Sequence, residues 1–208
     1  YQRELAGLGV DVRMGVEATP EALDALAPDA VVLAVGSTAV MPAIEGADGE
    51  KCVGCIEALR NEGALGHHVV IVGGGLVGCE MALDLINKGH EVEIVEALGD
   101  ILSSGIAVPL PNAMYLRDAF AHHGTPLHVG RRITAVTDEG AVVEDVATGE
   151  RETLPADSVV IAVGFRPQPS MAEALKSRGY EVHEVGDGRQ VGNIMTSIWD
   201  AYEVAHTL

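Results

Sequence analysis

Three glycines form the most chemically specific pattern in this sequence. Gly73, Gly75 and Gly78 are spaced as G-x-G-x-x-G and directly follow the apolar run at 69–72. In this pattern the first glycine makes a tight turn, and the second lets the backbone approach a pyrophosphate. The third lets a helix pack closely on a strand. Because the pattern stands between an expected strand and an expected helix, it predicts a dinucleotide site; the alternative is a glycine-rich turn without a ligand.

The helix that begins at Leu76 and Val77 would supply the anion-binding groups. Its free N–H groups and partial positive charge face the phosphates, so no basic side chain is required. Glu96 ends the next strand, twenty-three positions after Gly73. A carboxylate there accepts both ribose hydroxyls of an adenosine and repels a 2′-phosphate, which favours NAD(H) over its phosphorylated form. Glu80, in the same helix, is either a contact to the nicotinamide end or a solvated acid favoured by the helix dipole.

A second acidic position lies near the end of the chain. Gly186 and Asp187 follow an expected strand at 182–185, and Asn193 can cap a helix that runs on from residue 194. An acid at a strand end beside a helix N-terminus suits a sugar hydroxyl and an electron-rich ring. The alternative is a terminal helix that only closes the core.

The cysteines allow two interpretations. Cys52 and Cys55 form a C-x-x-C pair, which could be a redox dithiol or half of a metal site. No second pair completes a zinc site, and the eight histidines have no ligand spacing, so we expect no metal. Two incidental thiols in a linker are the simpler interpretation, and Cys79 is expected to be a small core residue.

Hydrophobic patterning predicts the elements that position these residues. A strand, a helix and a second strand are expected over the segment 67–96, followed by a helix at 112–123 and a short strand at 126–129. Residues 131–154 alternate and turn repeatedly, which indicates a small antiparallel meander, and 158–164 reads as another buried strand. We therefore expect an α/β fold: a Rossmann-like domain with a parallel sheet and the meander.

A weak internal repeat extends this organisation. Residues 28–36 match 156–164 at a constant offset of 128. Upstream of each block, a helix ends in glycine and leads to a strand ending in glycine, from Gly9 to Gly15 in the first copy and from Gly124 to Gly130 in the second. Only the second copy starts with the glycine pattern, so an earlier strand, glycine turn and helix are expected to precede Tyr1 in a longer parent protein.

Composition limits the classes of partner. The 208 residues carry a formal net charge of −18, which disfavours nucleic acid. No apolar run approaches the roughly 20 residues that cross a bilayer, so no membrane partner is expected. Three cysteines make no disulfide framework, and with no signal peptide the expected location is cytoplasmic.

Together these features resemble the two-dinucleotide-binding-domain flavoproteins of the pyridine nucleotide-disulfide oxidoreductase superfamily. Residues 69–80 resemble its NAD(P)H-binding domain. The segments ending at Gly36 and Gly164 resemble the strands on which the chain passes between the FAD and NAD domains, and Gly186-Asp187 resembles a motif whose Asp binds the ribityl chain of FAD. The resemblance thus implies cofactor contacts for these four residues.

The ending at 198–205 is most similar to NADH:flavin oxidoreductases related to 2,4-dienoyl-CoA reductase and enoate reductases. In that family a TIM barrel with FMN and a 4Fe-4S cluster precedes the FAD and NAD domains and reduces an unsaturated acyl substrate. The resemblance implies a partial FAD-binding domain at 1–62 and 168–208, into which an NAD(H)-binding domain at 63–167 is inserted. The catalytic residues stay unknown.

Two other functions remain open at this level. The first is a thioredoxin-reductase-like disulfide reductase. That family also carries a C-x-x-C pair between the segment that corresponds to the one ending at Gly36 and the glycine pattern that corresponds to Gly73–Gly78. Three features disfavour that interpretation: the ending of the chain, the carboxylate of Glu96, and Ile56 at the position after the cysteine pair, where that family has an Asp. The second is a non-catalytic nucleotide-binding module.

Overall fold

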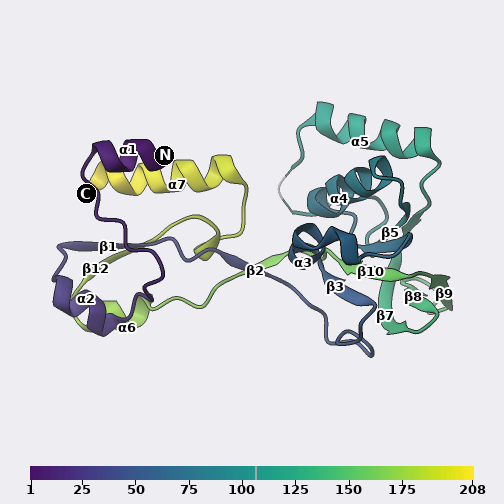
Figure 1. Ribbon diagram of the computed structural model, residues 1–208, viewed down its shortest axis with the longest axis horizontal. Helices are drawn as coiled ribbons and strands as arrows, with labels where there is room; N and C mark the ends of the chain where they lie inside the picture. The colour runs from purple at the N-terminus through teal and green to yellow at the C-terminus, as the bar shows by residue number, and fades with distance from the viewer. Residues whose placement is uncertain (106) are drawn as a thin grey trace.

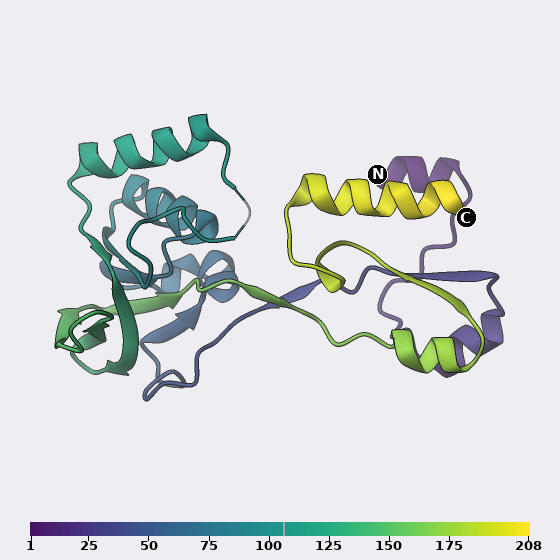
Figure 2. The same cartoon turned by 180° about the vertical axis from the view of Figure 1, so that it is seen from behind.

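A pair of short strands connects two groups of elements in this computed structural model, which describes residues 1–105 and 107–208 (Figure 1). Strand β2 (Ser37–Ala39) pairs antiparallel with β11 (Phe165–Pro167). The chain therefore passes from the smaller body to the larger body on β2 and returns on β11. Figure 2 shows the same connection from behind.

The larger body is built on a five-stranded parallel sheet in the order β3-β10-β4-β5-β6. Its strands are β3 (Cys52–Gly54), β4 (His68–Val72), β5 (Glu91–Glu96), β6 (Leu127–Val129) and β10 (Ser158–Ile161). The four valine and isoleucine residues at 69–72 are at most 4 % exposed. Continuous β-branched runs of this kind are typical of strands that are buried on both faces.

Helices cover one face of this sheet and a meander covers the other. The helices are α3 (Cys55–Arg60), η1 (Glu62–Ala64), α4 (Leu76–Asn87) and α5 (Leu110–His123). Residues of α3, α4 and α5 share one core cluster with Ile71 and Ile94, whereas Val70 and Val95 pack with Val143 of the meander in a second cluster. The meander consists of β7 (Arg131–Thr137), β8 (Gly140–Asp145) and β9 (Arg151–Pro155). The predicted Rossmann-like fold with an antiparallel meander is confirmed.

The smaller body contains one parallel strand pair, β1 (Ala30–Leu33) with β12 (Glu181–Glu184). Below it in Figure 1 lie α2 (Pro20–Leu26) and α6 (Ala172–Ser177), whose Leu175 packs with Val31 and Leu33. Above it, α1 (Gln2–Gly7) and α7 (Ile194–Thr207) lie side by side in both views. No residue of α1 or α7 is buried. The turn η2 (Gly186–Gly188) follows β12.

The predicted repeat is visible in the backbone. Strands β1 and β10 start and end at positions related by the predicted offset of 128 residues. Gly36 and Gly164, three residues after each strand, both adopt a positive φ, +77° and +108°. The two crossing segments are therefore structurally equivalent.

One predicted strand is wrong. Residues 9–15 form no strand, and Val10 and Val12 are 48 % and 55 % exposed. In the second copy the corresponding strand, β6, is held by β5. Residues 9–15 have no neighbouring strand within the described part of the chain, so their backbone N–H and C=O groups make no strand-to-strand hydrogen bonds.

The structure also places the segment 52–62 differently from the predicted division into domains. Strand β3 pairs with β10 of the larger sheet, and Cys55 and Ala58 of α3 lie in its core. This segment packs with the larger body and not with the smaller one. Over the described residues, no helix is long and apolar enough to span a membrane.

Candidate functional site

The glycine turn between β4 and α4 is tight because two of its glycines have no room for a side chain. Gly73 has a φ of +116°, and a Cβ there would lie 2.3 Å from the carbonyl oxygen of Ala162. A Cβ on Gly78 would lie 1.9 Å from the carbonyl oxygen of Gly73. Gly73 is therefore required where the turn passes the end of β10, and Gly78 is required where α4 packs on the turn and β4.

Gly75 differs from the other two. Its φ is −72°, and a Cβ there would meet only Ser104 Oγ, at 3.5 Å. The fold itself thus leaves space at Gly75, on the side of the turn that faces a cleft. A side chain at this position would project into that cleft.

The cleft contains the start of α4. Gly75 is the N-cap residue and no side chain caps the helix, so the first-turn N–H groups have no side-chain partner. The cleft encloses about 460 Å³. It is lined by six of the predicted site residues, namely Gly73, Gly75, Leu76, Val77, Glu96 and Gly164. Uncapped N–H groups at a concave site form an anion-binding surface.

Glu96 fixes the wall of this cleft. The residue is only 8 % exposed. Its Oε2 accepts a hydrogen bond from the Gly74 N–H at 2.7 Å, and its Oε1 accepts one from the Leu98 N–H at 2.7 Å. A carboxylate has about four acceptor positions, so two remain for a ligand's hydroxyl groups.

Arg117 of α5 holds the loop that follows Glu96 through hydrogen bonds. Arg117 of α5 donates to both carboxylate oxygens of Asp100, at 2.8 and 2.9 Å, and to the carbonyl oxygen of Ile101 at 2.8 Å. The guanidinium holds the pKa of Asp100 below its usual range. With Ile101 fully buried, the loop carries Ser104 into the cleft wall.

Two predicted residues lie outside this cleft. Gly78 is buried behind it, in the contact between α4 and β4. Glu80 lines a separate groove of about 450 Å³ between α4 and α5, together with Leu83 and Tyr115. A contact between Glu80 and a nicotinamide ring stays a prediction, and the groove places its carboxylate away from the glycine turn.

The remaining predicted residues line a second cleft of about 660 Å³ in the smaller body. Gly36, Gly186 and Asp187 contribute to it, together with the start of α7. Asp187 accepts hydrogen bonds from Ser37 Oγ at 2.9 Å and from the Gly192 N–H at 3.0 Å. The predicted cap of α7 is present, since Asn193 Oδ1 accepts from the Thr196 N–H at 2.9 Å.

The two clefts meet at one residue. Gly192, whose N–H is held by Asp187, lines both of them. Val191 and Gly192 of the smaller body thereby extend the wall of the cleft that begins at the glycine turn of the larger body. Ligands in the two clefts would approach each other at Gly192.

Sequence reasoning missed both basic residues that line the cleft, Arg131 and Arg132, at the start of β7. The strand before them pairs with β5 so that Val129 lies opposite Glu96. The sequence analysis predicted the strand at 126–129 and the meander after it but not the pairing of β6 with β5, and this pairing brings the two arginines to Glu96.

Cys55 and Cys79 are buried core residues, whereas Cys52 is partly buried. Cys52 packs against the cluster on the meander face of the sheet, whereas Cys55 lies in the cluster on the helical face. Burial raises the pKa of both thiols, and it raises the pKa of Cys79 to about 12. No group of three metal-ligating side chains occurs in the region that the structure covers.

Comparison with known proteins agrees with this geometry. The sequence pattern of the family described as "Pyridine nucleotide-disulphide oxidoreductase" matches residues 2–195. The chain belongs to this family. Members of this family are oxidoreductases that bind NAD and flavin, and the chain shares their Rossmann-type nucleotide-binding fold.

Several relatives match nearly all of the chain. It is 36 % identical to a cinnamate reductase of Clostridium sporogenes over 208 residues, which cover 100 % of this chain and 31 % of the relative. It is 33 % identical to an NADH oxidase of Thermoanaerobacter brockii over 214 residues, 98 % of this chain and 32 % of the relative. The chain thus spans about a third of the length of these relatives.

Among solved structures, a 2-naphthoyl-CoA reductase complex superimposes with a TM-score of 0.86 at 27 % identity, over 100 % of this chain and 31 % of that one. A thioredoxin reductase of T. acidophilum gives a TM-score of 0.67 at 20 % identity, over 86 % of this chain and 64 % of that one. The second likeness concerns the fold alone.

Proposed function

We propose that this chain is the NADH- and FAD-binding portion of a flavin-dependent oxidoreductase. NADH, when bound, supplies a hydride that an adjacent flavin can accept. The observation that carries the proposal is the meeting of the two clefts at Gly192. In this arrangement the larger body holds the donor, the smaller body holds part of the acceptor's site, and the protein's task is to align the two.

The cleft of the larger body fits a dinucleotide. The uncapped start of α4 would bind the pyrophosphate, and the open space at Gly75 would let the backbone approach it. The free acceptor positions of Glu96 would receive the adenosine ribose hydroxyls. We assign this unit to residues 63–167, together with β3 and α3, which pack in the same core.

The cleft of the smaller body fits one end of FAD. Asp187 would bind the ribityl hydroxyls, with Gly36 and Gly186 giving close access to the backbone. The start of α7 would stabilise negative charge on a reduced flavin ring. Strand β1 pairs only with β12 among the described residues, whereas its equivalent β10 pairs on both edges, with β3 and β4. We propose that an upstream segment of a longer protein supplies the missing strand and the phosphate-binding turn.

The onward substrate is proposed to be an unsaturated acyl compound. Two of the matching proteins are named a cinnamate reductase and a 2-naphthoyl-CoA reductase, and both compounds in these names carry a carbonyl carbon conjugated with carbon–carbon double bonds. By the family resemblance, this reaction would take place on a TIM barrel that carries FMN and a 4Fe-4S cluster, in a further part of a longer protein. The relatives' threefold greater length supports such an additional part.

The thiol geometry disfavours a disulfide reductase. Cys52 and Cys55 pack on opposite faces of the sheet, and burial raises the pKa of each thiol. A reactive dithiol instead needs adjacent sulfurs and a stabilised thiolate.

The test is to titrate the purified chain with NADH by calorimetry and then to add excess FAD without oxygen. We expect saturable NADH binding, and NADH-dependent loss of the flavin's visible absorbance that is faster than in free solution. The matched control is Gly75→Val, whose larger side chain blocks the cleft. Absence of NADH binding by the wild-type chain would contradict the proposal.

A further inference from the structure

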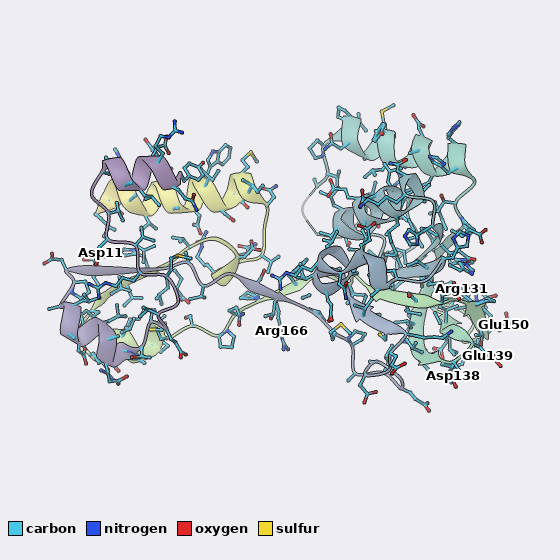
Figure 3. The ribbon with its side chains drawn as sticks, viewed as in Figure 1. Asp11, Arg131, Asp138, Glu139, Glu150 and Arg166 are labelled. Atoms are coloured by element: carbon cyan, nitrogen blue, oxygen red, sulfur yellow. The ribbon has the colours of Figure 1, made fainter. Side chains whose placement is uncertain are left out.

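A row of three charged side chains crosses the meander beside the NADH cleft. Arg132 of β7, Glu144 of β8 and Arg151 of β9 lie opposite one another in register. Side chains that face each other in this way on an antiparallel sheet are in direct contact. Figure 3 labels the neighbouring Arg131 in the larger body, near Glu150.

This row begins at the end of the cleft where Glu96 stands. Val129 is paired with Glu96, and the Gly130 N–H donates to the Leu98 carbonyl oxygen at 2.8 Å. Arg131 and Arg132 follow directly and line the cleft. The two guanidinium groups are therefore attached to the wall that would surround the adenosine ribose.

Glu144 accepts hydrogen bonds from both arginines of this row, Arg132 and Arg151. Its Oε1 accepts from Arg132 Nε at 3.1 Å, with a second contact from the same guanidinium, and its Oε2 accepts from Arg151 Nε at 2.8 Å. The bonds from Arg151 and Arg132 hold the pKa of Glu144 below its usual range, so the carboxylate is charged at neutral pH. Its side chain is 10 % exposed, whereas that of Arg132 is 60 % exposed and accessible to a ligand.

A guanidinium that is already bound to a carboxylate is a poor receptor for a phosphate. A 2′-phosphate binds arginine through the same paired N–H donors that Glu144 occupies. Arg131 is likewise balanced, with Asp145 and Glu152 each 3.6 Å away. The cleft thus contains the cations of a 2′-phosphate site, but acids of the meander hold them.

We infer that Glu144 is a specificity-determining residue that favours NADH over NADPH by keeping Arg132 engaged. In this arrangement Glu96 repels a 2′-phosphate directly, and Glu144 removes the cation that could compensate. The inference rests on the proposed function, because it requires the adenosine half of the nucleotide to lie at Glu96.

A double-mutant cycle on the purified chain tests the inference. Calorimetry would give dissociation constants for NADPH, NADH and 2′,5′-ADP with wild type, Glu96→Gln, Glu144→Gln and the double variant. We expect the double variant to gain NADPH and 2′,5′-ADP affinity by about tenfold or more beyond the product of the single effects, a coupling of about 1.4 kcal/mol. NADH affinity should change little on Glu144→Gln alone.

Two further variants identify the cation. Adding Arg132→Gln to the double variant should abolish the gain. The matched control is Arg151→Gln in the Glu96→Gln background. It removes the other partner of Glu144 but leaves Arg132 engaged, so it should give no gain. Circular dichroism and thermal denaturation would verify that each variant is folded.

The possible failures are distinguishable. If wild type binds NADH but the cycle shows no coupling, or if the gain survives Arg132→Gln, the role of Glu144 is overturned while the proposed function stands. If wild type binds neither nucleotide, the proposed function fails, and this inference fails with it.

Discussion

Val32 and Val160 occupy the same position in two equivalent strands, 128 residues apart, yet Val32 is 45 % exposed and Val160 is fully buried. Val160 packs in the core beneath the helices of the larger body. The same face of β1 lacks an equivalent cover within the described residues. The contrast identifies the place where the smaller body has an uncovered apolar surface.

Replacing each valine by alanine should therefore have unequal effects on this chain. We expect Val160→Ala to lower the free energy of unfolding by about 2 kcal/mol, because it removes buried methyl groups and leaves a cavity. Val32→Ala should change it by less than about 0.5 kcal/mol. Chemical denaturation of both variants measures the difference, and equal losses would show that β1 is covered in solution.

The three glycines of the turn should separate into folding and binding positions. Gly78→Ala should destabilise the chain by about 1–3 kcal/mol or more, because the added Cβ meets the Gly73 carbonyl oxygen at 1.9 Å. Gly75→Val should leave the melting temperature nearly unchanged and abolish NADH binding, because only Ser104 lies near a Cβ there. Thermal denaturation and calorimetry on both variants check this division. Normal NADH binding by Gly75→Val would show that the glycine pattern is only a turn and does not bind the nucleotide.

The sequence predicted the larger body well because its signals are local. The β-branched run at 69–72, the glycine turn and the alternation at 91–95 each determine a neighbouring element, and the structure has β4, α4 and β5 at these places. The positive φ of Gly124, at the C-cap of α5, likewise confirms a local helix stop.

Features that depend on distant partners were missed. The segment from Gly9 to Gly15 has the pattern of a strand, but a strand forms only where a neighbour accepts its hydrogen bonds. Arg132 enters the site because β6 pairs with β5, which no local pattern of 131–137 reveals. Glu80 lines the groove between α4 and α5, and its contact with a nicotinamide ring stays a prediction.

Nucleotide preference should follow the Glu96 carboxylate. We expect tighter binding of NADH than of NADPH by about tenfold or more, since a phosphate would face a carboxylate that is 8 % exposed. Glu96→Gln should weaken this preference and also loosen the loop, because both carboxylate oxygens accept backbone N–H groups. Calorimetric titration with both nucleotides measures the preference. Equal or tighter NADPH binding by wild type would show that Glu96 does not bind the adenosine ribose.

The thiols should be dispensable for electron transfer. In the complete enzyme, Cys52→Ala combined with Cys55→Ala should leave NADH-driven turnover with an artificial acceptor within about tenfold of wild type, because the two sulfurs pack in separate clusters. In the folded chain, Cys79 should react with thiol reagents only on unfolding, since its pKa is raised to about 12, chiefly by burial. A larger loss of turnover would support a disulfide-reductase function.

The purified chain should bind FAD weakly, because only part of the proposed FAD site lies in it. Asp187 and the start of α7 line a cleft that suits the ribityl chain and the ring. The described part of the smaller body contains no glycine turn leading into an uncapped helix, the feature that in the larger body lies at Gly73–Gly78.

Without that phosphate-binding turn, several charge-assisted hydrogen bonds are missing, each worth about 1.5–3 kcal/mol. Their loss is enough to weaken a tightly bound cofactor to micromolar affinity or beyond. A visible spectrum of the purified chain, followed by titration with FAD, measures this, and Asp187→Ala should weaken the residual binding further. Yellow protein that keeps one FAD per chain through gel filtration would show that the site in this chain is complete, and that the exposed face at Val32 has another purpose.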